Sequence, residues 1–261
     1  MEFDPISPIG VFDSGVGGLS ILRALRAELP AEDFVYLADA GFAPYGERDD
    51  SFVVERARAV AQRLIEGHVI KALVIACNTA TAAAIHLLRE ELPALPIVGV
   101  EPALKPALAL TGTGRIAVLA TRGTLASAKF RTLLASLDRQ ADFVLQACDG
   151  LADAIESGDE ARIADLCAQH IQALGRFGSD EGDIDTLVLG CTHYPFAQAQ
   201  LQAQVGTDVT LVETGVPVAR QTRRLLDAAG RLADGGSGHI ELLSTGDLAA
   251  LQRAAARWLS A

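Results

Sequence analysis

Short apolar runs alternate with longer segments of helical period along this chain. Each apolar run lacks the polar alternation of a half-exposed strand, which is typical of strands buried on both faces of a mostly parallel sheet. The runs are IGVFD, FVYLAD, LVIAC, IVGV, IAVLAT, FVLQA, LVLGC and VTLVET. The pattern therefore predicts an α/β protein, in which strands and covering helices alternate with right-handed crossovers.

The helices are expected between these strands. The first places Leu22 and Leu25 on one face and stops at Pro30, and the second begins with Ser51 as its N-cap. In the last helix Trp258 is expected to pack on the body of the protein. The predicted helices cover residues 18–29, 51–66, 160–174 and 246–259.

Two sub-assemblies of similar architecture are visible, one beginning with IGVFDSG and the other with RIAVLATRGT. The composition changes near residues 100–101, and the chain is expected to return to the first assembly after residue 211. We therefore expect two doubly wound α/β domains related by pseudo-symmetry. Residues 1–100 with 212–261 carry Cys77, and residues 101–211 carry Cys191.

Composition excludes several functional classes. The chain has 261 residues, half of them hydrophobic, and a net charge of −11, which argues against a general nucleic-acid or acidic-membrane binder. The acidic, proline-broken start MEFDPISPIG does not resemble a signal peptide, and no apolar run approaches the ~20 residues of a membrane span. A cytoplasmic protein is expected, with its four cysteines as thiols.

Polar groups gather where the predicted strands end, which is the edge at which open α/β sheets bind ligands. A loop after the second strand adds two more candidates. The candidate site residues are Asp13, Ser14, Tyr45, Gly46, Cys77, Asn78, Thr79, Thr121, Thr124, Cys191, Thr192 and His193.

The glycine-rich stretch DSGVGG has two readings. It is a tight strand–helix turn, or it binds an anion through backbone N–H groups and the helix dipole. It lacks the Gly-Lys-Ser/Thr of a Walker loop and the glycine order of a dinucleotide site. A phosphatase with Asp13 as nucleophile would need a second carboxylate two residues on, and none is present.

The cysteines divide into two pairs. Cys148 and Cys167 are expected to be small buried hydrophobes. Cys77 and Cys191 are followed directly by amide, hydroxyl or imidazole groups, which are poor core material. A zinc site through Cys191 and His193 lacks enough ligands, so no metal is expected, and a redox pair remains an alternative.

A two-thiol proton-transfer site fits Cys77 and Cys191 best. A stereocentre is inverted when one base removes its proton and an opposed acid delivers a proton to the other face. His193 and Asp13 lie where they can manage protons beside the two thiols. No cofactor fingerprint appears, so desolvation, hydrogen bonds to a substrate carboxylate and close placement of the thiolate must lower the barrier.

The motifs DSGVGGLSILRALRAELP, PYGER, ACNTATA, ATRGT and LGCTHYP resemble those of the glutamate racemases, in that order and over nearly the whole chain. ACNTA and GCTHYP at this separation are highly specific among α/β chains. The resemblance implies two flavodoxin-like domains with the active site in the cleft between them. It implies a cofactor-independent enzyme of the aspartate/glutamate racemase superfamily that supplies D-glutamate for peptidoglycan and can form a homodimer.

The resemblance also implies residue roles. Cys77 would serve the D-enantiomer with help from Asp13, and Cys191 the L-enantiomer with help from His193. Glu156 falls where the family has a helper carboxylate, although a solvated helix-end charge is the alternative. Substrate contacts would come from Asp13, Ser14, Tyr45, Gly46, Asn78, Thr79, Thr192 and His193, with Thr121 and Thr124 as extra carboxylate ligands.

The sequence departs from the glutamate racemase pattern in two places, and two other functions remain as alternatives. Many family members read Gly-Asp-Thr where this chain reads LADA, so Asp39 is kept but Ala40 replaces a hydroxyl. Some members use a long N-terminal extension in activation by a cell-wall precursor; we expect no such extension here and infer no such regulation. The rivals are a related racemase acting on aspartate or a hydantoin, and a non-catalytic anion-binding protein of the same fold.

Overall fold

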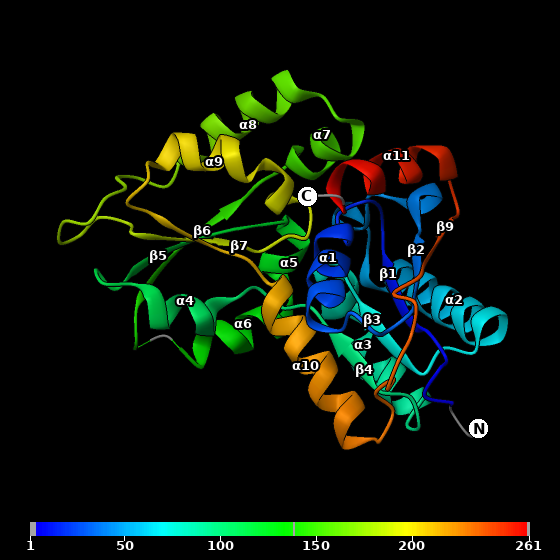
Figure 1. Ribbon diagram of the computed structural model, residues 1–261. Helices are drawn as coiled ribbons and strands as arrows, with labels where there is room; N and C mark the ends of the chain where they lie inside the picture. The colour runs from blue at the N-terminus through cyan, green and yellow to red at the C-terminus, as the bar shows by residue number, and fades with distance from the viewer. Residues whose placement is uncertain (1–3, 138, 260–261) are drawn as a thin grey trace. The chain divides into compact units, whose positions relative to one another are not determined.

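The computed structural model describes residues 4–137 and 139–259, which separate into two compact units (Figure 1). One unit ends at Val100 and resumes at Gly215, and the other runs from Glu101 to Thr214. Each unit is a parallel sheet covered by helices, so the predicted α/β class is confirmed. No helix among the described residues is long and apolar enough to cross a membrane.

The first unit contains a five-stranded sheet. Its order is β4-β3-β1-β2-β9, and every neighbouring pair is parallel. The strands are β1 (Ile9–Asp13), β2 (Phe34–Ala38), β3 (Ala72–Ile75), β4 (Ile97–Gly99) and β9 (Ile240–Ser244). The sequence pattern missed β9, because this edge strand is only partly buried and lacks a continuous apolar run.

Helices cover both faces of this sheet. They are α1 (Leu19–Glu28), α2 (Asp50–His68), α3 (Asn78–Glu91), α10 (Gly215–Ala228) and α11 (Leu248–Trp258). Helices α1 and α10 pack together, and α2 packs beside α3 over the opposite face. The predicted cap Ser51 is wrong: Asp49 is the N-cap of α2 and accepts a hydrogen bond from the Phe52 N–H at 2.8 Å. A carboxylate at that position also complements the helix dipole.

The second unit contains a four-stranded parallel sheet of order β6-β5-β7-β8. Its strands are β5 (Arg115–Ala120), β6 (Asp142–Ala147), β7 (Thr186–Leu189) and β8 (Thr210–Val212). Its helices are α4 (Leu104–Leu110), α5 (Arg122–Ala126), α6 (Ala128–Ala135), α7 (Leu151–Ser157), α8 (Glu160–Gln172) and α9 (Gln198–Val205). The expectation that every strand is buried on both faces is wrong for β6, an edge strand whose Leu145 is exposed.

The two sheets repeat one topology. Numbered within its own unit, each sheet carries its strands in the order 2-1-3-4, and β9 extends only the first. The residue that precedes each cysteine donates the same hydrogen bond to the neighbouring first strand, from Ala76 to Phe12 O and from Gly190 to Leu119 O, both 2.7 Å long. In this strand order the first and third strands flank the topological switch point, where such sheets bind ligands. Cys77 and Cys191 therefore occupy equivalent positions in the two units.

Candidate active site

In the first unit, Asp13 and Ser14 follow β1 while Cys77 follows β3, so they face each other across the switch point. The Cys77 Sγ lies 3.9 Å from the Ser14 Oγ. The Ser14 backbone N–H and hydroxyl both donate to the Asp13 Oδ1, at 2.6 and 3.2 Å. These side chains are buried, which places a carboxylate, a hydroxyl and a thiol together in a site largely withdrawn from water.

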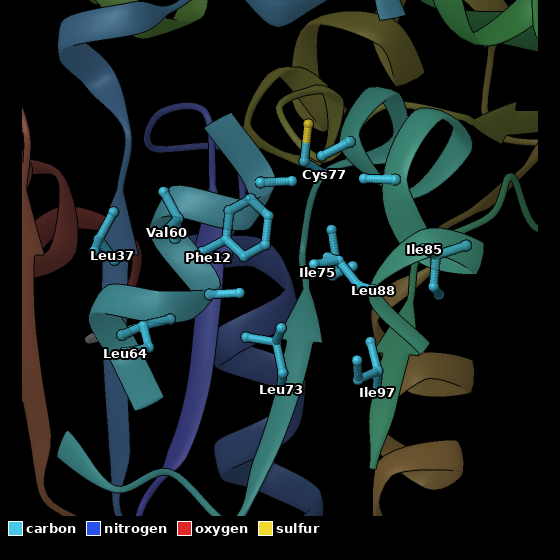
Figure 2. Packing of buried hydrophobic residues seen from close by; sticks show 14 of the residues in the cluster. Phe12, Leu37, Val60, Leu64, Leu73, Ile75, Cys77, Ile85, Leu88 and Ile97 are labelled. Carbon is cyan, nitrogen blue, oxygen red and sulfur yellow. The ribbon is translucent and has the colours of Figure 1, made fainter. Parts of the chain in front are cut away.

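Cys77 closes the end of a hydrophobic cluster formed by β1, β3, α2 and α3 (Figure 2). Phe12 and Ile75 lie beneath it, and its sulfur points away from these packed side chains. The thiol is therefore held by apolar packing on one side and turned toward the polar strand ends on the other.

Two residues fix the turn that carries Asp13. The buried Tyr36 hydroxyl donates to the Gly15 carbonyl oxygen at 2.7 Å. A Cβ on Gly18 would lie 2.7 Å from the Asp13 Cβ and 2.8 Å from the Tyr36 hydroxyl. The absence of a side chain at Gly18 therefore allows the start of α1 to approach β1 closely, which gives this glycine of DSGVGG a packing role without a phosphate.

Asn78 and Thr79 begin α3 directly after Cys77. Asn78 is buried, and neither its Oδ1 nor its Nδ2 has a hydrogen-bond partner. An unpaired buried amide is costly unless a ligand satisfies it. The free N–H groups and positive dipole end of a 14-residue helix add to this attraction for an anion.

Tyr45 and Gly46 lie in a short 3₁₀ turn before α2. Tyr45 is buried in the same cluster as Cys77, and its hydroxyl donates to the Asp39 Oδ2 at 2.5 Å. Burial and this hydrogen bond raise the Tyr45 pKa well above its ordinary value, so the hydroxyl stays protonated. Gly46 is partly buried.

In the second unit, Cys191 follows β7 and belongs to a chain of three groups. Its Sγ lies 3.8 Å from the His193 Nδ1. The His193 Nε2 lies 2.8 Å from the Glu156 Oε2, which α7 supplies. The structure thus joins the predicted Cys191 and His193 to Glu156, and the alternative of a solvated charge for Glu156 is wrong, because its carboxylate is engaged with a buried ring.

Burial alone would lower the pKa of His193. The hydrogen bonds to Cys191 and to Glu156 outweigh it and raise the pKa well above its ordinary value. A protonated His193 donates from both ring nitrogens, so it can pair with the Glu156 carboxylate on one side and stabilise a thiolate on the other whenever Cys191 acts as a base.

The hydroxyl residues of this unit are placed differently. Thr192 is buried beside Cys191 in the same turn. Thr121 is the N-cap of α5, and its hydroxyl donates to the Thr124 Oγ1 at 2.9 Å while accepting from the Thr124 N–H at 3.2 Å. Thr121 and Thr124 therefore bond mainly to each other at the end of β5.

The two remaining cysteines are buried, and Cys148 lies close enough to Cys191 for the two groups to interact electrostatically. Burial raises the pKa of Cys148 and raises that of Cys167 to about 11, so both stay thiols at neutral pH. No group of three or more His, Cys, Asp or Glu side chains within the described part of the chain could hold a metal ion.

The sequence pattern singled out neither Tyr36 nor Arg56. Arg56 lies on α2 and donates from Nε and Nη2 to the two Asp39 oxygens at 2.9 and 3.0 Å. From the sequence alone, Arg56 would be interpreted as an ordinary charged residue on the solvent-facing side of a helix. Only its distance to Asp39, 17 residues away, reveals a role.

Comparison with known proteins gives one consistent family. The family described as Asp/Glu/Hydantoin racemase matches residues 9–222. A glutamate racemase of Ralstonia pickettii is 47% identical over 94% of this chain and 86% of its own length.

Two solved structures are also similar to this chain. Escherichia coli glutamate racemase, in complex with L-glutamate and the activator UDP-MurNAc-ala, is 31% identical with a TM-score of 0.84, covering 97% of this chain and 95% of that one. Francisella tularensis glutamate racemase, in complex with D-glutamate, is 26% identical with a TM-score of 0.83, covering 98% and 95%.

Proposed function

The chain belongs to the Asp/Glu/hydantoin racemase family, and on this premise we propose that it interconverts L- and D-glutamate and supplies D-glutamate for peptidoglycan. Relatives that share nearly half of its residues over almost its whole length carry the name glutamate racemase. Structures similar over nearly the whole chain hold one or the other enantiomer of glutamate. The α/β fold with its two parallel sheets agrees with those structures.

We propose a two-thiol mechanism that needs no cofactor. The supporting observation is that each sheet carries a cysteine after its third strand, next to the switch point. His193 contacts Cys191 directly, and Asp13 is linked to Cys77 through the Ser14 hydroxyl. One thiolate takes the α-proton of glutamate, and the other cysteine, as a thiol, gives its proton to the opposite face of the same carbon. The thiol and thiolate states are thereby exchanged, and the reverse reaction starts from the exchanged state.

In each unit, an ionisable side chain near the cysteine assists proton transfer to and from its sulfur. Asp13, bonded to Ser14 beside Cys77, assists the thiol expected to act on D-glutamate. His193, held by Glu156, assists Cys191, which is expected to act on L-glutamate. The unpaired Asn78 amide and the N-terminus of α3 provide donors for a substrate carboxylate.

The direct test is circular-dichroism polarimetry of the purified protein with D-glutamate and then L-glutamate, without added cofactor. Decay of the signal from both enantiomers toward zero supports the proposal. Decay with aspartate or a hydantoin and none with glutamate would assign the chain to a related racemase. Binding of glutamate without any decay would favour the non-catalytic anion-binding protein.

Thr79→Ala and Thr192→Ala should each lower turnover about 10²-fold, because the loss of one oriented donor typically costs ~3 kcal/mol of transition-state stabilisation. Thr192 directly follows Cys191, and Thr79 lies two residues after Cys77. The fold should survive, as judged by an unchanged far-ultraviolet spectrum and cooperative thermal unfolding. Wild-type kinetics in either variant would remove that threonine from the substrate site.

We also propose a cytoplasmic location. All four cysteines are free and buried, including Cys148 and Cys167, which take no part in the proposed chemistry. That pattern is typical of a reducing compartment. A homodimer remains a prediction, which sedimentation velocity of the purified protein would test.

A further inference from the structure

The loop between β2 and α2 must hold Tyr45 and Gly46, yet it contains little regular structure. It consists of two 3₁₀ turns, η1 (Ala40–Phe42) and η2 (Tyr45–Glu47). Such turns have few backbone hydrogen bonds to define their position. Side-chain contacts must therefore set where the two residues lie relative to Cys77.

Arg56 and Asp39 supply the strongest of these contacts. Asp39 at the end of β2 is fully buried, and the Arg56 side chain is 18% exposed. The guanidinium donates two hydrogen bonds, one to each carboxylate oxygen, at 2.9 and 3.0 Å. This forked geometry fixes orientation as well as charge, and lysine cannot reproduce it.

Both turns of the loop are attached to this ion pair. The Asp39 Oδ2 that binds Arg56 also accepts the Tyr45 hydroxyl, so η2 is tied to it. The Arg56 guanidinium carbon lies 3.5 Å above the centre of the Phe42 ring, so η1 is held by a cation–π contact. Phe52 on α2 packs edge-on against Tyr45, with the ring centres 6.4 Å apart.

We propose that Arg56 and Asp39 are positioning residues that hold the Tyr45–Gly46 turn against the substrate on the Cys77 side. The proposal rests on the proposed function and deepens it. The Tyr45 hydroxyl is committed to Asp39, so the phenol acts as a tether and the turn offers glutamate its backbone at Gly46. The ion pair thus acts on substrate through the position of a turn and not through direct contact.

The test is a steady-state comparison of Arg56→Lys and Arg56→Gln with wild type, using both glutamate enantiomers. A loosened turn binds substrate less well, so KM should rise about tenfold in each variant while kcat changes less than threefold. The increase should persist in Arg56→Lys, because the charge is kept while the forked hydrogen bonding is lost. Thermal unfolding is measured in parallel, and kinetics are recorded at least 15 °C below each midpoint.

Arg58→Gln is the matched control. Arg58 lies on the same helix and makes the same kind of contact, with its Nε 2.9 and 3.0 Å from the two Glu91 oxygens, but that pair is exposed and away from the loop. Its KM should equal that of wild type. A KM increase in Arg58→Gln as large as that in Arg56→Gln would overturn the proposal, as would an unchanged KM in Arg56→Lys.

A double variant separates positioning from general stability. Tyr45→Phe cuts the tether while keeping the ring, so it should raise KM by a similar factor. In Tyr45→Phe/Arg56→Gln the two increases should not multiply, because both substitutions break one connection. If the two increases in KM multiply fully, the positioning proposal is wrong. If the wild-type protein does not act on glutamate, the proposed function itself is wrong.

Discussion

Cys77→Ser and Cys191→Ser should each abolish detectable racemisation of glutamate, lowering kcat/KM at least about 10³-fold in either direction. A serine hydroxyl is far too weak an acid or base at neutral pH to replace a thiol, and positioned acid–base groups contribute up to ~10⁴-fold. Enantiomers have equal free energies in water, so kcat/KM must fall equally for L- and D-glutamate. Polarimetry in both directions measures this directly.

Proton exchange in D₂O distinguishes the two cysteines, because exchange needs only the base that faces the substrate proton. Cys77→Ser should still wash deuterium into the α-position of L-glutamate, since Cys191 remains, and should not label D-glutamate. Cys191→Ser should show the opposite preference. Substantial racemisation by both single variants would rule out the two-thiol mechanism.

Cys167→Ser provides the matched control for these substitutions. Cys167 is fully buried in α8, and its pKa is raised to about 11 by burial, so its thiol takes no part in proton transfer. The same sulfur-to-oxygen change there should lower the thermal midpoint and leave kcat/KM within about threefold of wild type. A 10³-fold activity loss in Cys167→Ser would show that such losses report on folding.

His193→Asn should lower kcat/KM about 10³-fold, and Glu156→Gln about 10²-fold. The first removes the group beside the Cys191 sulfur and also the ring that the Glu156 carboxylate contacts. The second keeps His193 but removes one of the two interactions that raise its pKa. Initial rates with both enantiomers would give the order of the two effects, and equal rates in Glu156→Gln and wild type would refute the chain of three groups.

The pH dependence of kcat tests the direction in which Glu156 changes the pKa of His193. A raised pKa means that His193 keeps its proton as pH rises through the neutral range and loses it only above the raised value. In Glu156→Gln the carboxylate no longer favours the imidazolium while burial still opposes it, so the pKa of His193 falls. The alkaline limb of the kcat profile should therefore move to lower pH, and a shift to higher pH would contradict this account.

Glu160→Gln is a suitable control for the charge change. Glu160 lies in the first turn of α8 at an exposed position, and its carboxylate accepts a hydrogen bond from Gln200. Removing this charge near the same site tests whether the profile responds to net charge alone. An unchanged alkaline limb in Glu160→Gln would assign the shift to the contact between Glu156 and His193.

Local pattern was sufficient for much of the fold. Continuous apolar runs predicted β1 through β8, because strands inside a parallel sheet are apolar throughout and the edge strand β6 keeps enough apolar residues to be recognised. The same rule failed at β9, where an edge strand with Glu241 at its second position needs no such run. At α2 the pattern misplaced the cap, because Ser51 and Asp49 are both good caps and only the geometry of the turn selects Asp49.

The sequence by itself determined the α/β class, the two similar sub-assemblies and the placement of a cysteine after a buried strand in each. These features are local, because periodicity and motif order are properties of neighbouring residues. Tertiary structure alone decided which distant groups meet. Glu156 reaches His193 only because β6 and β7 flank β5, and Arg56 reaches Asp39 only because α2 packs beside the end of β2. Strand order and helix packing depend on the whole folded chain, so no local pattern encodes these contacts.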